Sequence, residues 1–245
     1  MPLHFVDPTA GALQPGELLV LTGAEAHHAA VVRRIRVGEE VTVGDGAGTW
    51  LTGTCESASS REVEVRVTGR RDVPASSPRL VLVQALAKGD RDELAVQAAT
   101  ELGVDEIVPW QAARSVSRWE GMKAEKGRAR WEAIVREAAK QAHRPWIPQV
   151  SGLTRTAQLA ERAASALVVV LEPSAEEALT GLAAQVRDAD EIVLVVGPEG
   201  GIATEELQAL QSAGARIARL GTEVLRTSTA GPAALAAVAV ALGRW

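Results

Sequence analysis

Two short stretches near the C-terminus decide the fold: Gly197-Pro198-Glu199-Gly200-Gly201-Ile202, and Leu220-Gly221-Thr222-Glu223-Val224-Leu225-Arg226-Thr227-Ser228-Thr229-Ala230. The first follows the apolar run 192–196 and precedes a helix start at 204–207, with Thr204 as a plausible N-cap. A glycine-rich turn between a strand and a helix can bring bare backbone N–H groups close to a ligand. The second stretch also follows a short apolar run and leads into an alanine-rich helix. Together they predict the two walls of one pocket.

The glycine turn fits neither of the common phosphate-binding patterns. No Gly-Lys-Ser/Thr follows it, as a P-loop requires, and its spacing differs from that of the dinucleotide fingerprint. An ordinary turn between a strand and a helix is the simpler alternative. As a ligand site, Gly200 and Gly201 would let the backbone approach an adenosine or methionine group. In the second stretch, backbone groups of Leu220, Val224 and Leu225 could bond an adenine edge.

The chain from Arg79 onward alternates between strands and helices. Strands are expected at 80–85, 106–109, 166–171, 192–196 and 216–220, and helices at 90–102, 123–142 and 231–242. This alternation predicts an α/β fold with a parallel sheet and with ligands at the carboxyl ends of the strands. Leu171, Gly197 and Leu220 stand at three such ends.

The first seventy residues instead indicate a small β-barrel. Residues 39–43 alternate in polarity and meet the glycine-rich turn 44–48, and 50–55 is a return strand. Residues 61–67 alternate charge with valine, and 24–34 is a short helical insert. A proline- and serine-rich stretch over 70–78 fits a domain boundary. We therefore predict an N-terminal domain over 1–72 and a C-terminal domain over 77–245.

Composition excludes several classes of protein. The 245 residues are 47% hydrophobic but only 3% aromatic, so a core must consist of aliphatic side chains. A single cysteine, Cys55, excludes an internal disulfide and a CxxC metal site. Adjacent histidines such as His27 and His28 diverge on a helix, so no metal is expected. No run is long enough to span a bilayer and no signal peptide is recognisable, which favours the cytoplasm.

Basic residues gather in three places although the formal net charge is −5. The clusters are Arg33, Arg34 and Arg36; Arg70, Arg71 and Arg79; and nine Lys and Arg residues between Arg114 and Arg144. Solvated helix faces are the simpler interpretation of any one cluster. Three basic clusters on an acidic chain are typical of a local RNA-binding surface. Trp119, which lies in the third, could stack on a base.

The two C-terminal stretches resemble the cofactor loops of the SPOUT methyltransferases, and in particular those of the RsmE family, which methylates N3 of a uracil in small-subunit ribosomal RNA. The resemblance extends upstream to further landmarks: Lys88-Gly89-Asp90-Arg91, Glu101-Leu102-Gly103-Val104, Pro109, Arg114, Ser115, and the run from His27 to Gly38. It therefore covers nearly the whole chain. The glycine turn alone would be a weak signal, but the combination is specific.

The resemblance implies a SPOUT α/β domain with a trefoil knot, a PUA-like β-barrel, S-adenosylmethionine as cofactor, a homodimer, and ribosomal RNA as partner. The implied cofactor-binding residues are Leu171, Glu172, Pro173, Gly197, Pro198, Glu199, Gly200, Gly201, Leu220, Gly221, Val224, Leu225, Arg226 and Thr227. The implied RNA-binding residues are Arg33, Arg34, Arg36, Lys88, Arg91, Arg114 and Arg144.

Two residues are candidates for catalysis, because uracil N3 must lose a proton before it can be methylated. Glu199 could act as the base, or could instead cap the following helix. Arg226 could stabilise charge that develops on the uracil oxygens. Many relatives have Arg-Thr-Glu-Thr where this chain has Arg226-Thr227-Ser228-Thr229, so no acid is expected to act there. Relatives also often have glycine at the position of His143.

The expected function is therefore methylation of N3 of a specific uridine in 16S ribosomal RNA. Two alternatives stay open. The protein could be a SPOUT methyltransferase acting on transfer RNA or on a ribose 2′-oxygen, or it could be a catalytically silent RNA-binding factor for ribosome assembly.

Overall fold

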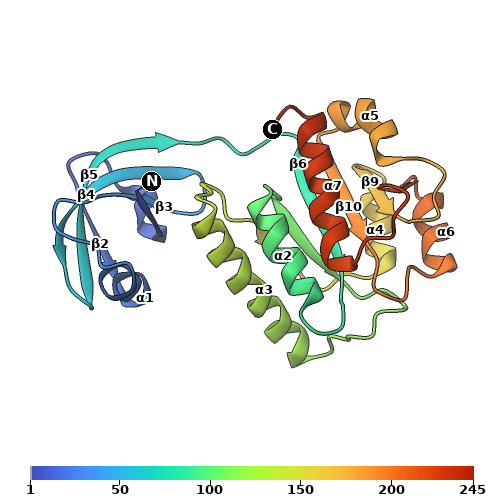
Figure 1. The fold of residues 1–245 in the computed structure, drawn as a ribbon, viewed down its shortest axis with the longest axis horizontal. Helices are drawn as coiled ribbons and strands as arrows, with labels where there is room; N and C mark the ends of the chain where they lie inside the picture. The colour runs from blue at the N-terminus through green and yellow to red at the C-terminus, as the bar shows by residue number, and fades with distance from the viewer. Residues whose placement is uncertain (1) are drawn as a thin grey trace. The chain divides into compact units, whose positions relative to one another are not determined.

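The computed structural model describes residues 2–245 (Figure 1). The chain divides into two compact units. The first contains the residues up to Ala75 together with Ala139–Ile147, and the second contains Ser76–Ala138 and Pro148–Trp245. Within the described residues, no helix is long and apolar enough to cross a membrane.

The first unit is a curled, mixed five-stranded sheet in the order β1-β3-β4-β5-β2 (Figure 1). Its strands are β1 (Leu3–Val6), β2 (Leu18–Thr22), β3 (Glu40–Gly44), β4 (Thr49–Ala58) and β5 (Glu62–Asp72). β1 and β3 pair in parallel and the other neighbours pair antiparallel. Within residues 2–245 no pairing closes β1 onto β2, so the barrel stays open. This is the PUA-like architecture that the family resemblance implies.

The alternating pattern places one face of each strand in the core. Val63, Val65 and Val67 of β5 are buried beside Phe5 and Leu51, while the charged residues between the valines point outward. The predicted hairpin is confirmed as the β3–β4 pair. The sequence analysis missed β1 and β2, because four or five apolar residues with little alternation do not distinguish a strand from a buried turn.

Short helices fill the connections of this unit. They are the 3-10 helix η1 (Pro8–Ala12), α1 (Gly23–His27) and the π-helix η2 (His28–Val32). The predicted helical insert is therefore present, but its second half is wound as a π-helix. Arg34, just after it, has a left-handed φ of 55°.

The stretch Ala139–Ile147 is held in the first unit by several polar contacts. Lys140 Nζ lies 2.8 Å from Glu25 Oε1, and both side chains are largely buried. Trp146 Nε1 donates to the Val73 carbonyl at 2.8 Å, and Gly48 N donates to the Pro145 carbonyl at 3.0 Å. The sequence analysis treated both domains as continuous stretches, and no local pattern marks this return of the chain.

The second unit contains a six-stranded sheet in the order β11-β9-β10-β6-β7-β8, in which every neighbouring pair is parallel. Its strands are β6 (Arg79–Ala85), β7 (Glu106–Trp110), β8 (Gln149–Val150), β9 (Leu167–Leu171), β10 (Glu191–Val196) and β11 (Arg216–Ala218). The predicted SPOUT-type α/β domain with a parallel sheet is confirmed. Only the two-residue β8 was not expected.

Five α-helices connect these strands: α2 (Arg91–Glu101), α3 (Met122–Gln141), α4 (Thr156–Arg162), α5 (Ala183–Asp188, after the 3-10 helix η3, Leu179–Leu182) and α6 (Thr204–Ser212). A sixth helix, α7 (Thr227–Ala241), follows the last strand. The sequence analysis did not specify α4 and α5. Gly103 follows α2 with φ +92°, as a glycine after a helix end should.

One predicted N-cap and one predicted helix start were wrong. The N-cap of α6 is Ala203 rather than Thr204, because the Glu206 carboxylate three residues later accepts the Ala203 N–H. α7 begins at Thr227, four residues before the expected start at Gly231, so the second sequence stretch also supplies the first turn of this helix.

α7 lies directly on the sheet, where it contacts β6 and β10, and it also packs along α2 (Figure 1). Gly231 permits this approach, because a Cβ there would lie 2.9 Å from a Leu82 methyl carbon. The threading of the chain through its own loop, which the resemblance implies, stays a prediction.

A charged network joins the amino-terminal ends of three strands. Arg162, the last residue of α4, contacts Glu106 of β7 at 2.7 Å and Glu191 of β10 at 2.8 Å. Arg79 of β6 lies 3.1 Å from Glu106, and Ser151 also donates to the Glu106 carboxylate. Burial raises the pKa of Glu106, but these partners outweigh it and hold the pKa below its ordinary value.

Candidate active site

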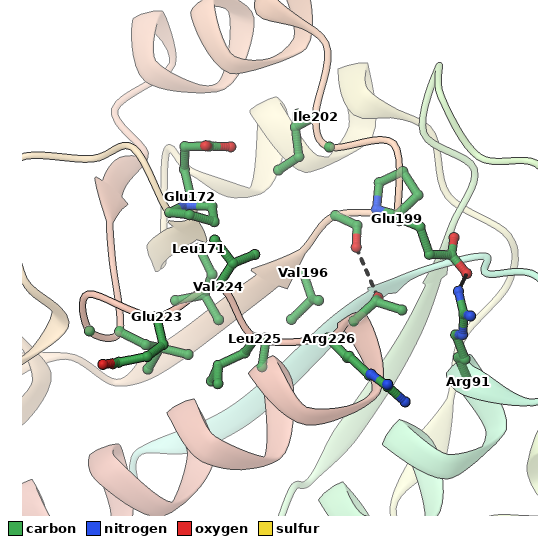
Figure 2. A pocket seen from close by; sticks show the side chains of 18 residues that line it. Arg91, Leu171, Glu172, Val196, Glu199, Ile202, Glu223, Val224, Leu225 and Arg226 are labelled. Atoms are coloured by element: carbon green, nitrogen blue, oxygen red, sulfur yellow. Dashed lines mark hydrogen bonds and ion pairs between the residues drawn. The ribbon is translucent and has the colours of Figure 1, made fainter.

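A cavity of about 400 Å³ lies at the carboxyl ends of β9 and β10 (Figure 2). Three segments surround it: the end of β9 at Leu171 to Pro173, the glycine turn after β10, and the loop from Leu220 to the start of α7. Arg91, from the start of α2, also lines the cavity. The structure thus brings together two stretches of sequence about twenty residues apart, at the edge where a parallel sheet binds ligands.

Thirteen of the fourteen predicted cofactor-binding residues line this cavity. They are Leu171, Glu172, Pro173, Gly197, Pro198, Glu199, Gly201, Leu220, Gly221, Val224, Leu225, Arg226 and Thr227. Gly200 is the remaining one, and a Cβ there would meet Arg114 at 3.4 Å. Val196, Ile202, Glu223 and Ala230 line the cavity as well, although the sequence analysis did not name them as site residues.

The cavity wall combines apolar side chains with unused backbone donors. Leu171, Val196, Ile202 and Leu225 supply apolar surface (Figure 2). Within residues 2–245, none of the backbone N–H groups from 220 to 226 donates to a protein acceptor. Unpaired donors beside an apolar surface suit a flat, polar-edged ligand such as an adenine ring.

Glu199 is paired with one cation and one backbone N–H rather than directed freely into the cavity. Its Oε1 accepts from the Lys88 backbone N–H at 3.1 Å. It also accepts from Arg91 Nη1 at 2.9 Å (Figure 2). Burial raises the pKa of Glu199, but backbone hydrogen bonds and Arg91 outweigh this and lower it below its ordinary value. The carboxylate therefore stays ionised and ties the segment Lys88 to Arg91 to the glycine turn.

Arg226 is exposed at the N-cap of α7 (Figure 2). Within the described part of the chain, its guanidinium has neither a hydrogen-bond partner nor an ion-pair partner, in contrast to Arg91. It is therefore a charge at the cavity that is available to a bound molecule.

The loop after β7 is fastened to the glycine turn. Arg114 Nη1 donates to the Gly200 carbonyl at 3.2 Å. The Glu206 carboxylate accepts from the Ala113 N–H at 3.0 Å and from the Thr156 hydroxyl at 2.7 Å. Sequence reasoning missed Glu206, although a glutamate three residues after a helix start is a recognisable capping pattern.

The remaining predicted RNA-binding residues are distributed over both units. Lys88 and Arg91 are exposed in the second unit. In the first unit Arg33, Arg34 and Arg36 are exposed, and Val31, Val32 and Val37 beside them are between 46% and 68% exposed. Arg144 is half-buried.

Two aromatic residues considered in the sequence analysis have packing roles. Trp119 is buried against Trp131 at 5.2 Å between ring centroids, so it does not present its ring for base stacking. His143 has a left-handed φ of 53°, a conformation that glycine adopts more readily than histidine, and its ring lies 5.3 Å from the His4 ring. Within residues 2–245, no group of three or more His, Cys, Asp or Glu side chains could hold a metal ion.

Fold and cavity agree with the comparisons to known proteins. A family model described as an RNA methyltransferase domain matches residues 75–239, and one described as an RNA methyltransferase PUA domain matches residues 21–68. These matches define the class as an RNA methyltransferase with an attached PUA domain.

Curated relatives define the family more narrowly. The ribosomal RNA small subunit methyltransferase E of Mycobacterium bovis is 47% identical over 99% of this chain and 93% of its own. The Bacillus subtilis protein of the same name is 30% identical over 97% of this chain and 96% of its own. The chain therefore belongs to the ribosomal RNA small subunit methyltransferase E family.

Solved structures agree with this assignment. A methyltransferase of Legionella pneumophila, solved with bound SAM, superposes with a TM-score of 0.88 at 30% identity over 98% of both chains. The ribosomal RNA small subunit methyltransferase E of Neisseria gonorrhoeae, solved with S-adenosyl methionine, gives a TM-score of 0.82 at 26% identity over 98% of both chains.

Proposed function

We propose that this protein transfers a methyl group from S-adenosylmethionine to N3 of a specific uridine in 16S ribosomal RNA. The observation that carries the proposal is the cavity between the glycine turn and the loop 220–226, with its row of unpaired backbone N–H groups. The names of the family relatives and the cofactor bound in the solved structures support it.

The cavity fits S-adenosylmethionine in size and chemistry. A volume of about 400 Å³ lies within the range of small-molecule sites. Leu171, Val196 and Leu225 would hold the adenine face, and the backbone donors of 220–226 would meet its edge. Such a cofactor supplies an already activated methyl group, so the protein has mainly to place the uracil in line with it.

The chain's own groups would assist the loss of the N3 proton. Arg226, which is unpaired within the described residues, is the group that would stabilise negative charge on the uracil oxygens. Glu199 stays a candidate base, but its pairing with Arg91 and its lowered pKa favour a role in holding the segment Lys88 to Arg91.

We assign RNA docking to the first domain, over 1–72, and catalysis to the second, over 77–245. The exposed Arg33, Arg34 and Arg36 would contact phosphates of the ribosomal RNA. Lys88, Arg91, Arg114 and Arg144 would extend these contacts. A ribosomal RNA methyltransferase acts where ribosomes are assembled, so we place the protein in the cytoplasm.

We also propose that the protein is a homodimer. Leu94 of α2 is 50% exposed and Val240 of α7 is 62% exposed, on two helices that pack against each other. Exposed aliphatic side chains on adjacent helices favour an interface with a second copy.

The decisive experiment combines cofactor binding with analysis of the product. Calorimetry should show saturable binding of S-adenosylmethionine. Small subunits and naked 16S RNA from a strain lacking the gene should gain 3-methyluridine, which mass spectrometry of nucleosides detects. Absence of cofactor binding would establish the silent assembly factor instead. A methyl group on a ribose or on transfer RNA would establish the other alternative.

A further inference from the structure

A buried hydrogen-bond chain runs beneath the cavity and links three elements. Gln84 Nε2, at the end of β6, donates to the Thr227 hydroxyl at 2.9 Å. The same hydroxyl donates to the Gly197 carbonyl at 2.9 Å. Gln84 is 0% exposed and Thr227 is 7% exposed, so water does not compete for these bonds.

The direction of this chain is fixed by chemistry. A hydroxyl has one hydrogen, and that of Thr227 goes to the Gly197 carbonyl. Its oxygen can therefore only accept from Gln84, whose amide has two hydrogens. The second of these goes to the Ala85 carbonyl at 3.1 Å. If residue 84 had no hydrogen-bond donor, the Thr227 hydroxyl would still donate to the Gly197 carbonyl. It would lose its hydrogen bond to β6.

Stability alone does not account for a glutamine at this position. Within the described residues, Gln84 Oε1 is buried and has no hydrogen-bond partner. An unpaired buried acceptor is destabilising, whereas an apolar side chain of the same shape would avoid that penalty. A glutamine at position 84 is explained if its N–H donor is needed to hold the Thr227 hydroxyl.

The location of this hydrogen-bond chain indicates which parts of the cavity it holds in place. Gly197 begins the glycine turn, and Thr227 is the first residue of α7, directly after Arg226. Gln84 pairs in register with Val196, which lines the cavity. The two cavity walls are thus joined to each other and to the central sheet at one point.

We propose that Gln84 is a positioning residue that acts through Thr227 to hold the two cofactor loops, and with them Arg226, in their binding arrangement. This inference rests on the proposed function, because it concerns the same cavity. It assigns a role to a residue that does not itself line the cavity.

The test uses Gln84→Met, which keeps the shape and removes the donor, and Thr227→Ser, which keeps the hydroxyl. Gln84→Met should unfold at a temperature no lower than that of the wild type. Its Kd for S-adenosylmethionine should rise about tenfold, or about 1.4 kcal/mol. Its kcat should also fall, because Arg226 is less well held. Thr227→Ser can still accept from Gln84 and donate to the Gly197 carbonyl, so it should lose less affinity for the cofactor than Gln84→Met.

Thr227→Val and Thr100→Val form a matched pair. The Thr100 hydroxyl donates to the Val96 carbonyl at 2.8 Å inside α2, and Thr100, like Thr227, is a buried residue. Thr227→Val should lose affinity for the cofactor, whereas Thr100→Val should lower the unfolding temperature without changing Kd. If Thr227→Val does not fold, Gln84→Met and Thr227→Ser still decide the question.

Amide hydrogen exchange separates this inference from the proposed function. Without any ligand, residues 220–230 should exchange faster in Gln84→Met than in the wild type. Unchanged exchange, or cofactor affinity within about threefold of the wild type, would overturn the positioning role. If the wild type binds no S-adenosylmethionine while exchange in the variant is faster, the proposed function fails and the positioning role stands.

Discussion

At the scale of single residues, Arg226 and Glu199 line the same cavity but differ in their electrostatic surroundings. Glu199 is neutralised by Arg91 at 2.9 Å and accepts a backbone N–H as well. The Arg226 guanidinium has no protein partner within residues 2–245 and is exposed at the start of α7. The paired carboxylate suits a structural role and the unpaired guanidinium suits a role toward a ligand.

Replacement of Arg226 should reduce methyl transfer. If it stabilises charge on the uracil, Arg226→Ala should lower kcat with little change in the Kd of S-adenosylmethionine. Arg226→Lys should not restore activity, because lysine keeps the charge but loses the planar fork of donors. Steady-state kinetics and calorimetry measure the two quantities. Values of both within about threefold of the wild type, or about 0.65 kcal/mol, would reduce Arg226 to a surface residue.

Glu199→Gln distinguishes a structural role from general-base catalysis. The amide oxygen can still accept from the Lys88 N–H, while the ion pair with Arg91 is lost. We expect kcat to fall less than about tenfold, since loss of a general base costs about a hundredfold or more. A fall of that larger size, together with loss of the acidic limb of the pH–rate profile, would make Glu199 the base.

At the scale of elements, the carboxyl ends and the amino ends of the parallel strands have different roles. The carboxyl ends of β9 and β10 form the cavity. The amino ends of β6, β7 and β10 carry Arg79, Glu106 and Glu191, which Arg162 of α4 joins into one charged network. This network holds the sheet together away from the ligand edge.

Acid should weaken this network in a defined pH range. Because the folded pKa of Glu106 is lowered, its contribution to stability is complete above the unfolded pKa, near 4.5, and is lost as the pH falls through the lower folded value. Chemical denaturation between pH 7 and 3 should show this decline. Arg162→Met should cost about 2 kcal/mol at pH 7, less than a fully buried pair would, because Arg162 is partly exposed.

The Arg162→Met variant also provides the result that would contradict this prediction. Without Arg162, the free energy of unfolding should depend less steeply on pH below about 4.5, since the carboxylate has lost its main partner. An unchanged slope would show that other carboxylates govern acid denaturation. Cofactor affinity should not change, because Arg162 does not line the cavity.

At the scale of the whole molecule, the chain builds its first unit from two separate stretches. Ala139–Ile147 belongs to that unit and places Lys140 against Glu25 and Trp146 against Val73. A chain truncated near Ser77 would expose these side chains and would not test RNA docking cleanly. Substitutions in the full chain are the better test.

Arg33, Arg34 and Arg36 should contribute to RNA binding but not to cofactor binding. Replacement of all three by glutamine should weaken binding of 16S RNA and reduce its salt dependence by up to about three in slope, because fewer counterions are released. The Kd of S-adenosylmethionine should not change. Filter binding at several salt concentrations measures the first effect and calorimetry the second.

A charge-matched control removes three other exposed arginines: Arg61, Arg155 and Arg187. It alters the net charge equally, so any general electrostatic effect appears in both variants. If the control weakens RNA binding as much as the replacement of the Arg33 cluster does, the docking role of that cluster is refuted.

By itself, the sequence determined the strands and helices with strong periodicity, the parallel sheet, and the two loops that form the cavity. These features depend on local alternation, on glycine placement and on the order of elements along the chain, all of which a single chain displays. Thirteen of the fourteen cofactor-binding residues that the family resemblance implies also line this cavity.

Only the tertiary structure decided how residues distant in sequence are paired. The ion pair of Glu199 with Arg91, the clamp of Glu206 on Ala113, and the chain from Gln84 through Thr227 join positions 93 to 143 residues apart. No periodicity encodes such contacts, because each partner taken alone is an ordinary residue of a strand, a helix start or a loop. Whether a carboxylate is a base or an anchor depends on the partner that folding places beside it, since that partner sets its pKa.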